Sequence, residues 1–207
     1  MVSYLINSGT EIVVEGIQYI SSKYPEYDSY DLIDKATGKF YSLDMILESV
    51  KELNIEKDLF KIFIFDFIIG NRDRHHSNWA ILKNGVDNKV CPVYDNTSSL
   101  GAYVNDSKID RCINDKNWFE AQVDRQSISM IALDGKRVRH SEFVTYLRNN
   151  YYLETFDFVE NVVKKLTNDS IEKLMNSYEG LLSNSKIVFI KKFLLRKVEI
   201  LKEIYKL

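Results

Sequence analysis

Hydrophobic residues recur at helical spacing over much of the chain after position 42. Residues 42–53, "SLDMILESVKEL", carry apolar side chains every three or four positions behind the cap candidate Ser42, which predicts an amphipathic helix. Residues 58–69 are apolar on nearly every side, which predicts a buried central helix that ends at Gly70. Helical spacing returns in four later segments, at residues 140–151, 154–166, 168–182 and 183–207.

Shorter apolar runs separated by turn residues predict a small amount of β-structure. "NWAILKNG" and "KVCPVYD", residues 78–85 and 89–95, flank a turn-rich link and predict a β-hairpin. The first forty residues predict a few short strands or irregular segments. Residues 107–138 mix charged and isolated apolar positions, and only "ALDGKRV" stands out there, as a turn. We therefore expect a mainly α fold of the α+β class, with residues 1–207 forming a single domain.

Polar side chains collect between the predicted central helix and the hairpin. Asp73 to Asn78 form a loop there, and Asp95 follows the second hairpin strand. Because paired strands lie about 5 Å apart, the start of one and the end of the other are neighbours. We therefore expect Asn78 and Asp95 at the same end of the hairpin, beside Asp73.

Composition narrows the classes of partner. The chain has 207 residues, is 45% hydrophobic and has a net charge of −2, so it can bury a core and gives no electrostatic reason to expect nucleic acid or an anionic membrane as partner. Cys91 and Cys112 lack metal-ligand spacing and predict reduced thiols. The first residues show neither a signal peptide nor a membrane span, so we expect a cytoplasmic protein.

The residue types in the loop favour phosphoryl transfer. One Asp can orient and deprotonate a hydroxyl, while an Asn and a second Asp supply the hard oxygen ligands that Mg²⁺ prefers. Kinases divide the work in this way, and the Asp-x4-Asn spacing of Asp73 and Asn78 matches their catalytic loops. ATP and Mg²⁺ are the cofactors that this chemistry requires.

Two stretches together resemble the catalytic core of HipA-like kinases, relatives of phosphatidylinositol 3-/4-kinases. "GNRDRHHSNWAIL", residues 70–82, is similar to the lipid-kinase pattern Asp-Arg-His-x-x-Asn, and "CPVYDNTSSLG", residues 91–101, to the Pro-x-Tyr/Phe-Asp element of the HipA-like proteins. "SYLINSGTEIV", residues 3–13, also resembles the segment after the hinge. The resemblance extends over residues 1–101, and the later helices fit in general character.

The resemblance implies a kinase C-lobe, a helical bundle with a small hairpin that carries the site. It implies that Asp73 is the catalytic base and that Asn78 and Asp95 bind Mg²⁺ and, through it, the nucleotide. His75 would support the loop or approach the γ-phosphate. The resemblance assigns no role to Arg74 or His76.

The implied function is that of a bacterial, toxin-type serine/threonine kinase acting on a protein substrate. Some members of this type are held inactive by an antitoxin. No glycine-rich loop and lysine-bearing strand precede Asp73, so we expect a C-lobe that needs an N-lobe, which a separately encoded subunit could supply. The alternative is an inactive kinase-like module that binds a protein partner.

Other side chains have simpler interpretations. His75, His76 and His140 lack the spacing of a zinc site. Ser98 and Ser99 could accept a phosphoryl group, but polar turn residues are the simpler interpretation.

Overall fold

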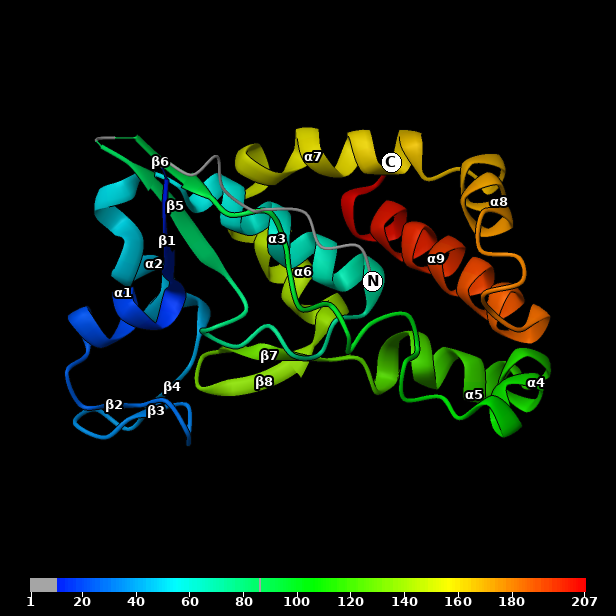
Figure 1. Ribbon diagram of the computed structural model, residues 1–207, viewed down its shortest axis with the longest axis horizontal. Coiled ribbons are helices and arrows are strands. Elements are labelled where there is room, and N and C mark those ends of the chain that lie inside the picture. Colours follow the sequence, from blue (N-terminus) through cyan, green and yellow to red (C-terminus); the bar gives the residue numbers. More distant parts are fainter. Residues whose placement is uncertain (1–10, 86) are drawn as a thin grey trace. The chain divides into compact units, whose positions relative to one another are not determined.

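The computed structural model describes residues 11–85 and 87–207, and contacts among the residues divide it into two compact units. Unit 1 comprises the described residues up to Ile62 with Asp73–Asn96 and Ser129–Val138. Unit 2 comprises Phe63–Arg72, Thr97–Ile128 and Arg139–Leu207. Figure 1 traces the chain through its elements. The single domain expected for residues 1–207 stays a prediction, and most of residues 3–13 lie outside the described residues.

A three-stranded antiparallel sheet carries the predicted hairpin in unit 1 (Figure 1). β5 (Ala80–Asn84) pairs with β6 (Asp87–Val90), with Ile81 opposite Val90, so the hairpin is confirmed. β1 (Ile12–Glu15) adds a third strand on the other side of β5. The hairpin is therefore the part of a sheet that leads directly into and out of the polar loop.

Short elements complete unit 1. α1 (Gly16–Lys23) follows β1, and β2 (Tyr27–Asp28), β3 (Ile33–Asp34) and β4 (Lys39–Phe40) form a second small sheet. The helix expected after residue 42 is confirmed as α2 (Leu43–Val50), with a 3₁₀ turn η1 (Lys51–Leu53) behind it. Ser42 caps α2, because its hydroxyl accepts a hydrogen bond from the Met45 backbone N–H at 3.3 Å.

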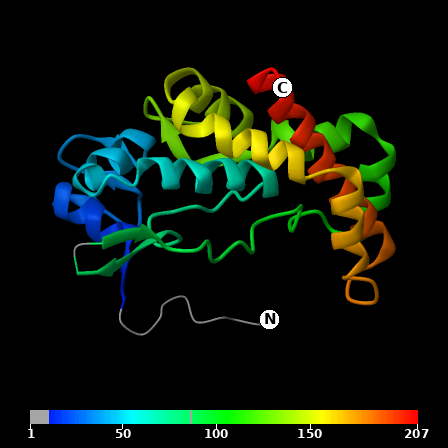
Figure 2. The same ribbon diagram turned by 90° about the horizontal axis from the view of Figure 1, so that it is seen from above.

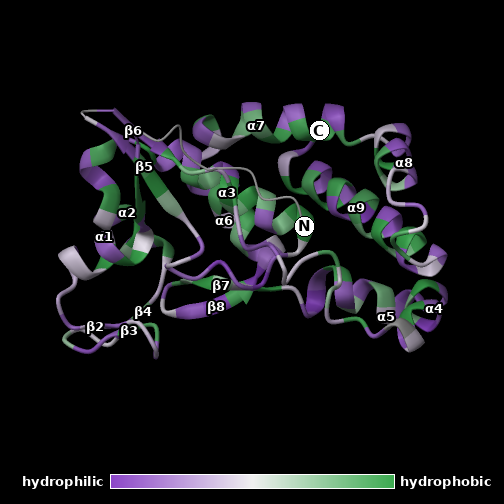
Figure 3. Cartoon of the chain, viewed as in Figure 1, coloured by the Kyte–Doolittle hydropathy of each residue, from purple (hydrophilic) through white to green (hydrophobic). Residues whose placement is uncertain are grey.

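The predicted central helix is confirmed as α3 (Glu56–Ile69), which begins two residues earlier than expected. Leu59, Ile64 and Phe67 on it are completely buried, and Figure 3 shows mostly hydrophobic residues along its length. Gly70 ends the helix in the left-handed conformation, with φ +66°. The polar loop therefore begins at a fixed point, directly after a buried helix.

Unit 2 is mainly helical. Its helices are α4 (Asp106–Asn114), α5 (Lys116–Glu120), the π-helical turn η2 (Ala121–Arg125), α6 (His140–Asn150), α7 (Tyr152–Lys165), α8 (Asn168–Asn176) and α9 (Asn184–Tyr205). The long α9 contacts α4, α6, α7 and α8, and Figures 1 and 2 both show α7 and α9 side by side. The four helical segments predicted after residue 140 are therefore confirmed.

Residues 107–138, which had little readable pattern, contain most of α4, all of α5 and η2, and most of the hairpin of β7 (Ile128–Leu133) and β8 (Lys136–Arg139). The predicted turn is confirmed at Asp134 and Gly135, both with positive φ. The mixed pattern has a physical reason, since several short, half-buried elements follow one another too quickly to establish a period.

Helices and small sheets together make the chain an α+β protein, as expected. Within residues 11–85 and 87–207, we find no helix with both the length and the hydrophobicity to span a membrane. Both cysteines are free and buried.

Candidate active site

The loop from Asp73 to Asn78 lies in unit 1 and is closed by its own hydrogen bonds. The Asn78 side-chain nitrogen Nδ2 donates to the Asp73 carbonyl oxygen at 2.6 Å, and the Asn78 backbone N–H donates to the His75 carbonyl oxygen at 2.9 Å. Asn78 is buried, whereas Asp73 is half-buried. Because the amide nitrogen of Asn78 serves the loop, its oxygen Oδ1 is the end that remains for a ligand.

Arg74 joins this loop to the segment that carries Asp95. Its side chain is only 2% exposed. Nη1 donates to the carbonyl oxygens of Asn78 at 2.6 Å and Tyr94 at 2.9 Å, and Nη2 donates to Oδ1 of Asn96 at 2.6 Å. Both neighbours of Asp95 are therefore hydrogen-bonded to the residue that follows Asp73.

A second hydrogen bond reinforces this connection. The Tyr94 hydroxyl donates to the Ser77 carbonyl oxygen at 2.9 Å, and the Tyr94 ring packs against a buried cluster of Ala80, Leu82 and Cys91. The hairpin core thus holds the end of the Asp95 segment against the loop.

Asp95 itself has an unusual backbone. Its φ is +47°, in the left-handed region that residues other than glycine rarely adopt, and its side chain is exposed. Strain of this kind persists only where the surroundings enforce it, and it clusters at functional sites. Here the hydrogen bonds from Arg74 to Tyr94 and Asn96 hold the residues on either side of Asp95.

His76 anchors the loop through contacts with two tyrosine side chains. Its Nδ1 lies 2.9 Å from the Tyr27 hydroxyl, and its ring meets the rings of Tyr27 and Tyr41 edge to face. Burial, with a smaller contribution from neighbouring His75, lowers the pKa of His76 to about 4. His76 is therefore a neutral imidazole near pH 7, and its tautomer sets which partner donates in the hydrogen bond between its Nδ1 and the Tyr27 hydroxyl.

The start of α1 holds the backbone of the same loop. The Ile17 N–H donates to the His76 carbonyl oxygen at 3.0 Å, and the Gly16 N–H donates to the Trp79 carbonyl oxygen at 2.9 Å. A Cβ at Gly16 would lie 2.2 Å from the Trp79 ring, so only glycine allows this approach. The Trp79 indole N–H in turn donates to the Tyr41 hydroxyl at 2.9 Å.

His75 makes a local contact. Its Nδ1 accepts a hydrogen bond from the Ser77 backbone N–H at 3.2 Å, and its side chain is half-buried. Of the two roles expected for His75, this contact corresponds to support of the loop.

The donor set of the site suits Mg²⁺. Asp95 offers an exposed carboxylate and Asn78 an amide oxygen, both hard ligands, and Mg²⁺ usually takes one or two protein ligands and keeps the rest for phosphate and water. The residues present therefore fit a magnesium ion bound together with a nucleotide.

Sequence reasoning singled out Asp73, His75, Asn78 and Asp95, which the structure places on this loop and on the segment that Arg74 joins to it. It missed Arg74, His76 and Tyr27. The pattern gave no sign of them, because their partners lie 4 to 49 positions away and the contacts arise only in the fold.

Comparisons with known proteins point to kinases. The serine/threonine-protein kinase CtkA of Helicobacter pylori is 24% identical over 127 residues, which cover 57% of this chain and 39% of that protein. The chain thus matches about two fifths of the length of its curated relative. No protein-family profile matches the chain.

The fold agrees with this similarity. The crystal structure of the H. pylori proinflammatory kinase CtkA superposes with a TM-score of 0.76 at 16% sequence identity, covering 96% of this chain and 70% of that one. At that identity the match shows a shared fold. This chain therefore shares the α+β fold of that kinase structure.

Proposed function

We propose that this chain is the catalytic part of a HipA-like serine/threonine kinase that transfers a phosphoryl group from Mg·ATP to a protein hydroxyl. The observation that carries the proposal is the Arg74 guanidinium, which connects the Asp73 loop to the segment of Asp95. A kinase needs its base and its metal ligands on two adjoining segments, and this connection supplies that arrangement.

In this mechanism Asp73 accepts a hydrogen bond from the acceptor hydroxyl and takes its proton as the phosphoryl group is transferred. Asn78 and Asp95 would hold the metal ion, which would supply positive charge to offset that of the nucleotide phosphates. His75 supports the loop by accepting the Ser77 N–H. Arg74 and His76 keep the loop in place and touch no reacting atom.

Phosphoryl transfer depends mainly on positioning and charge neutralisation, so loss of the groups that hold the β- and γ-phosphates raises the barrier by several kcal/mol. We propose that these groups come from an N-lobe, either encoded with this sequence or supplied by a separate subunit. A toxin role, with an antitoxin as partner, is part of the same proposal.

Incorporation of radiolabelled phosphate from ATP into protein tests the proposal. The chain is assayed alone and with an N-lobe, in the presence and absence of Mg²⁺. We expect labelling that needs Mg²⁺ and the N-lobe and falls at least about 100-fold in Asp73→Ala, since a general base contributes about 10²- to 10⁴-fold.

Asp87→Ala is the matched control, because Asp87 is an exposed carboxylate on β6 in the same unit. It should keep full activity. Strong labelling by the chain alone would contradict the need for an N-lobe. If no combination is active while the protein stays folded, the alternative of an inactive module that binds a protein partner replaces the kinase proposal.

A further inference from the structure

A small polar cavity of about 20 Å³ lies in unit 2, large enough for about one water molecule. Its polar walls are the side chains of Arg72, Ser98, Tyr103, Gln122 and Ser127. All of them can donate hydrogen bonds, and no carboxylate is among the residues that line it. The cavity is therefore chemically suited to an anion.

Arg72 brings an uncompensated cation to this cavity. Its guanidinium lies 5.6 Å from the centre of the Tyr103 ring, and the side chain is half-buried. Within the part of the chain that the structure describes, Arg72 makes no hydrogen bond or ion pair. A guanidinium has five N–H donors and matches the oxygens of a phosphate well, so Arg72 can accept an anionic partner without giving up another.

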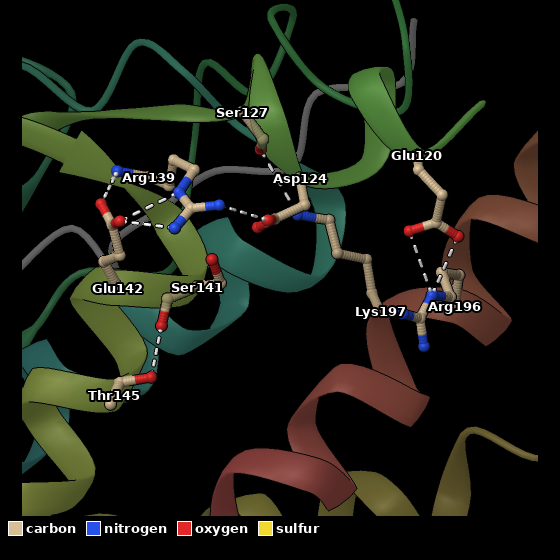
Figure 4. A network of polar contacts seen from close by, with 9 residues as sticks. All are labelled: Glu120, Asp124, Ser127, Arg139, Ser141, Glu142, Thr145, Arg196 and Lys197. Atoms are coloured by element: carbon tan, nitrogen blue, oxygen red, sulfur yellow. Dashed lines mark hydrogen bonds and ion pairs between the residues drawn. The ribbon is translucent and has the colours of Figure 1, made fainter. Parts of the chain in front are cut away.

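Lys197 is a second cation next to the cavity, and it is fully buried. Its Nζ donates to the Ser127 hydroxyl at 3.3 Å (Figure 4). It also lies 4.3 Å from the centre of the Phe67 ring. The neighbouring carboxylate of Asp124 is bound by Arg139, whose Nη1 lies 3.2 Å from Oδ2. Burial lowers the pKa of Lys197 to about 7, which a nearby dianion would raise again.

The pKa of His140 reflects the charges of both Arg72 and Lys197. Its Nδ1 lies 2.9 Å from the Ser127 hydroxyl oxygen. Burial, followed by the charges of Lys197 and Arg72, lowers the pKa of His140 to about 3. Lys197 and Arg72 are therefore both close enough to His140 to act on it electrostatically, and His140, which is neutral near pH 7, adds no charge of its own.

Ser98 stands at the wall of this cavity. It is 9% exposed, and its Oγ lies 2.8 Å from the hydroxyl oxygen of Tyr103, which is 66% exposed. The segment around it has a left-handed residue at Leu100, with φ +53°. Such strain makes local opening less costly, so a kinase can gain access to Ser98 when the segment opens, and Tyr103 can move to enlarge the cavity.

We infer that this cavity is the receiving site for a phosphoryl group on Ser98, with Arg72 as its main ligand. In the modification, Ser98 Oγ forms a bond to the γ-phosphorus of a nucleoside triphosphate. The bond from that phosphorus to the bridging oxygen breaks, the nucleoside diphosphate leaves, and the hydroxyl proton passes to the base of the acting kinase. The product carries nearly two negative charges and three acceptor oxygens for Arg72, Tyr103 and Ser127.

The consequence for catalysis rests on the proposed function. Arg72 directly precedes Asp73 in the chain. A phosphoryl group held by Arg72 restrains the backbone next to the proposed base, so phosphorylation of Ser98 should favour the active conformation of the loop.

Genetically encoded phosphoserine at position 98 of the full chain tests the inference without any need for kinase activity. We expect the phosphorylated protein to melt about 3 °C or more above the unmodified protein, as a gain of about 1 kcal/mol produces in a chain of this size. In ³¹P NMR its phosphate should titrate below the usual second pKa of about 6. In Arg72→Met, at least half of the gain in melting temperature should be lost.

Phosphoserine at position 99 is the matched control. The Ser99 hydroxyl is buried and has no hydrogen-bond partner among residues 11–85 and 87–207, so a phosphate there should lower the melting temperature. The inference is overturned if phosphate at position 98 destabilises the protein, or if its effect is the same with and without Arg72. Because both readouts are independent of activity, such a failure leaves the proposed kinase function to its own test.

Discussion

The guanidinium of Arg74 is buried among carbonyl oxygens that come from two separate segments. Its acceptors belong to residues 78, 94 and 96, 4 to 22 positions along the chain. The motif assigns roles to Asp73 and Asn78 through their spacing, but a hydrogen bond from Arg74 to a distant carbonyl leaves no periodic trace. The sequence therefore nominated residues for the candidate site, whose roles stay predictions, and it could not predict the hydrogen bonds that connect their two segments.

Replacement of Arg74 by Met should destabilise the protein. Buried acceptors that lose a charged donor cost about 1.5 to 3 kcal/mol each, so we expect the free energy of unfolding in urea to fall by at least about 3 kcal/mol. Lys61→Met is the control, since Lys61 forms an exposed ion pair with Asp58 and should cost under about 1 kcal/mol. Equal effects for the two variants would show that Arg74 does not hold the loop.

The buried His76 makes stability depend on pH. In the unfolded chain it binds a proton below about pH 6.5, whereas the pKa of about 4 in the fold delays protonation. The unfolded state therefore binds more protons between pH 6.5 and 4, and stability falls as the pH drops through this range, by up to about 3 kcal/mol.

Urea unfolding at several pH values measures this dependence. His76→Gln should remove most of the His76 contribution to the slope of the unfolding free energy against pH. His75→Gln, a change at the half-buried neighbour, should leave that contribution in place. A slope unchanged in His76→Gln would contradict a neutral, buried His76.

At the scale of elements, the strongest sequence signals gave the correct structures. Ser42 predicted the start of α2, apolar residues on all sides predicted α3, and the turn-rich link predicted the β5–β6 hairpin. β1 and α1 escaped prediction, because four- and eight-residue elements contain too few positions to show a period. Their identity depends on pairing with β5 and on contact with the loop, which are tertiary interactions.

Gly70, which links α3 to the loop, should not tolerate a side chain. A Cβ there would lie 2.7 Å from the Phe193 ring, in a residue with φ +66°. At Gly38, where φ is +70°, an added Cβ would meet no other atom of the described residues within 4 Å, so Gly38→Ala measures the backbone strain alone. We expect a loss of about 1 kcal/mol for Gly38→Ala and at least about 2 kcal/mol for Gly70→Ala, measured by urea unfolding. Equal losses would mean that the Phe193 contact costs nothing.

At the scale of the whole molecule, the sequence predicted the α+β class that the structure shows. The helices after residue 140 could be predicted because the hydrophobic residues of each one recur at the spacing of an amphipathic helix. The partition of the described residues into two compact units could not be predicted from the sequence, because long-range contacts decide it. Arg72 and Arg74 illustrate this, since they flank Asp73 in the chain but belong to different units.

Binding of Mn²⁺, a spectroscopic substitute for Mg²⁺, tests the central claim that Asn78 and Asp95 hold a metal together with a nucleotide. Electron paramagnetic resonance measures free Mn²⁺ as the protein is titrated in the presence and absence of ATP, with ATP-only samples as reference. We predict that the wild-type protein binds Mn²⁺ together with ATP, that Asp95→Asn weakens this binding at least about tenfold, and that Asp73→Asn, which changes the base, alters it less than about threefold. Wild-type binding that is independent of ATP, or undiminished in Asp95→Asn, would contradict the account.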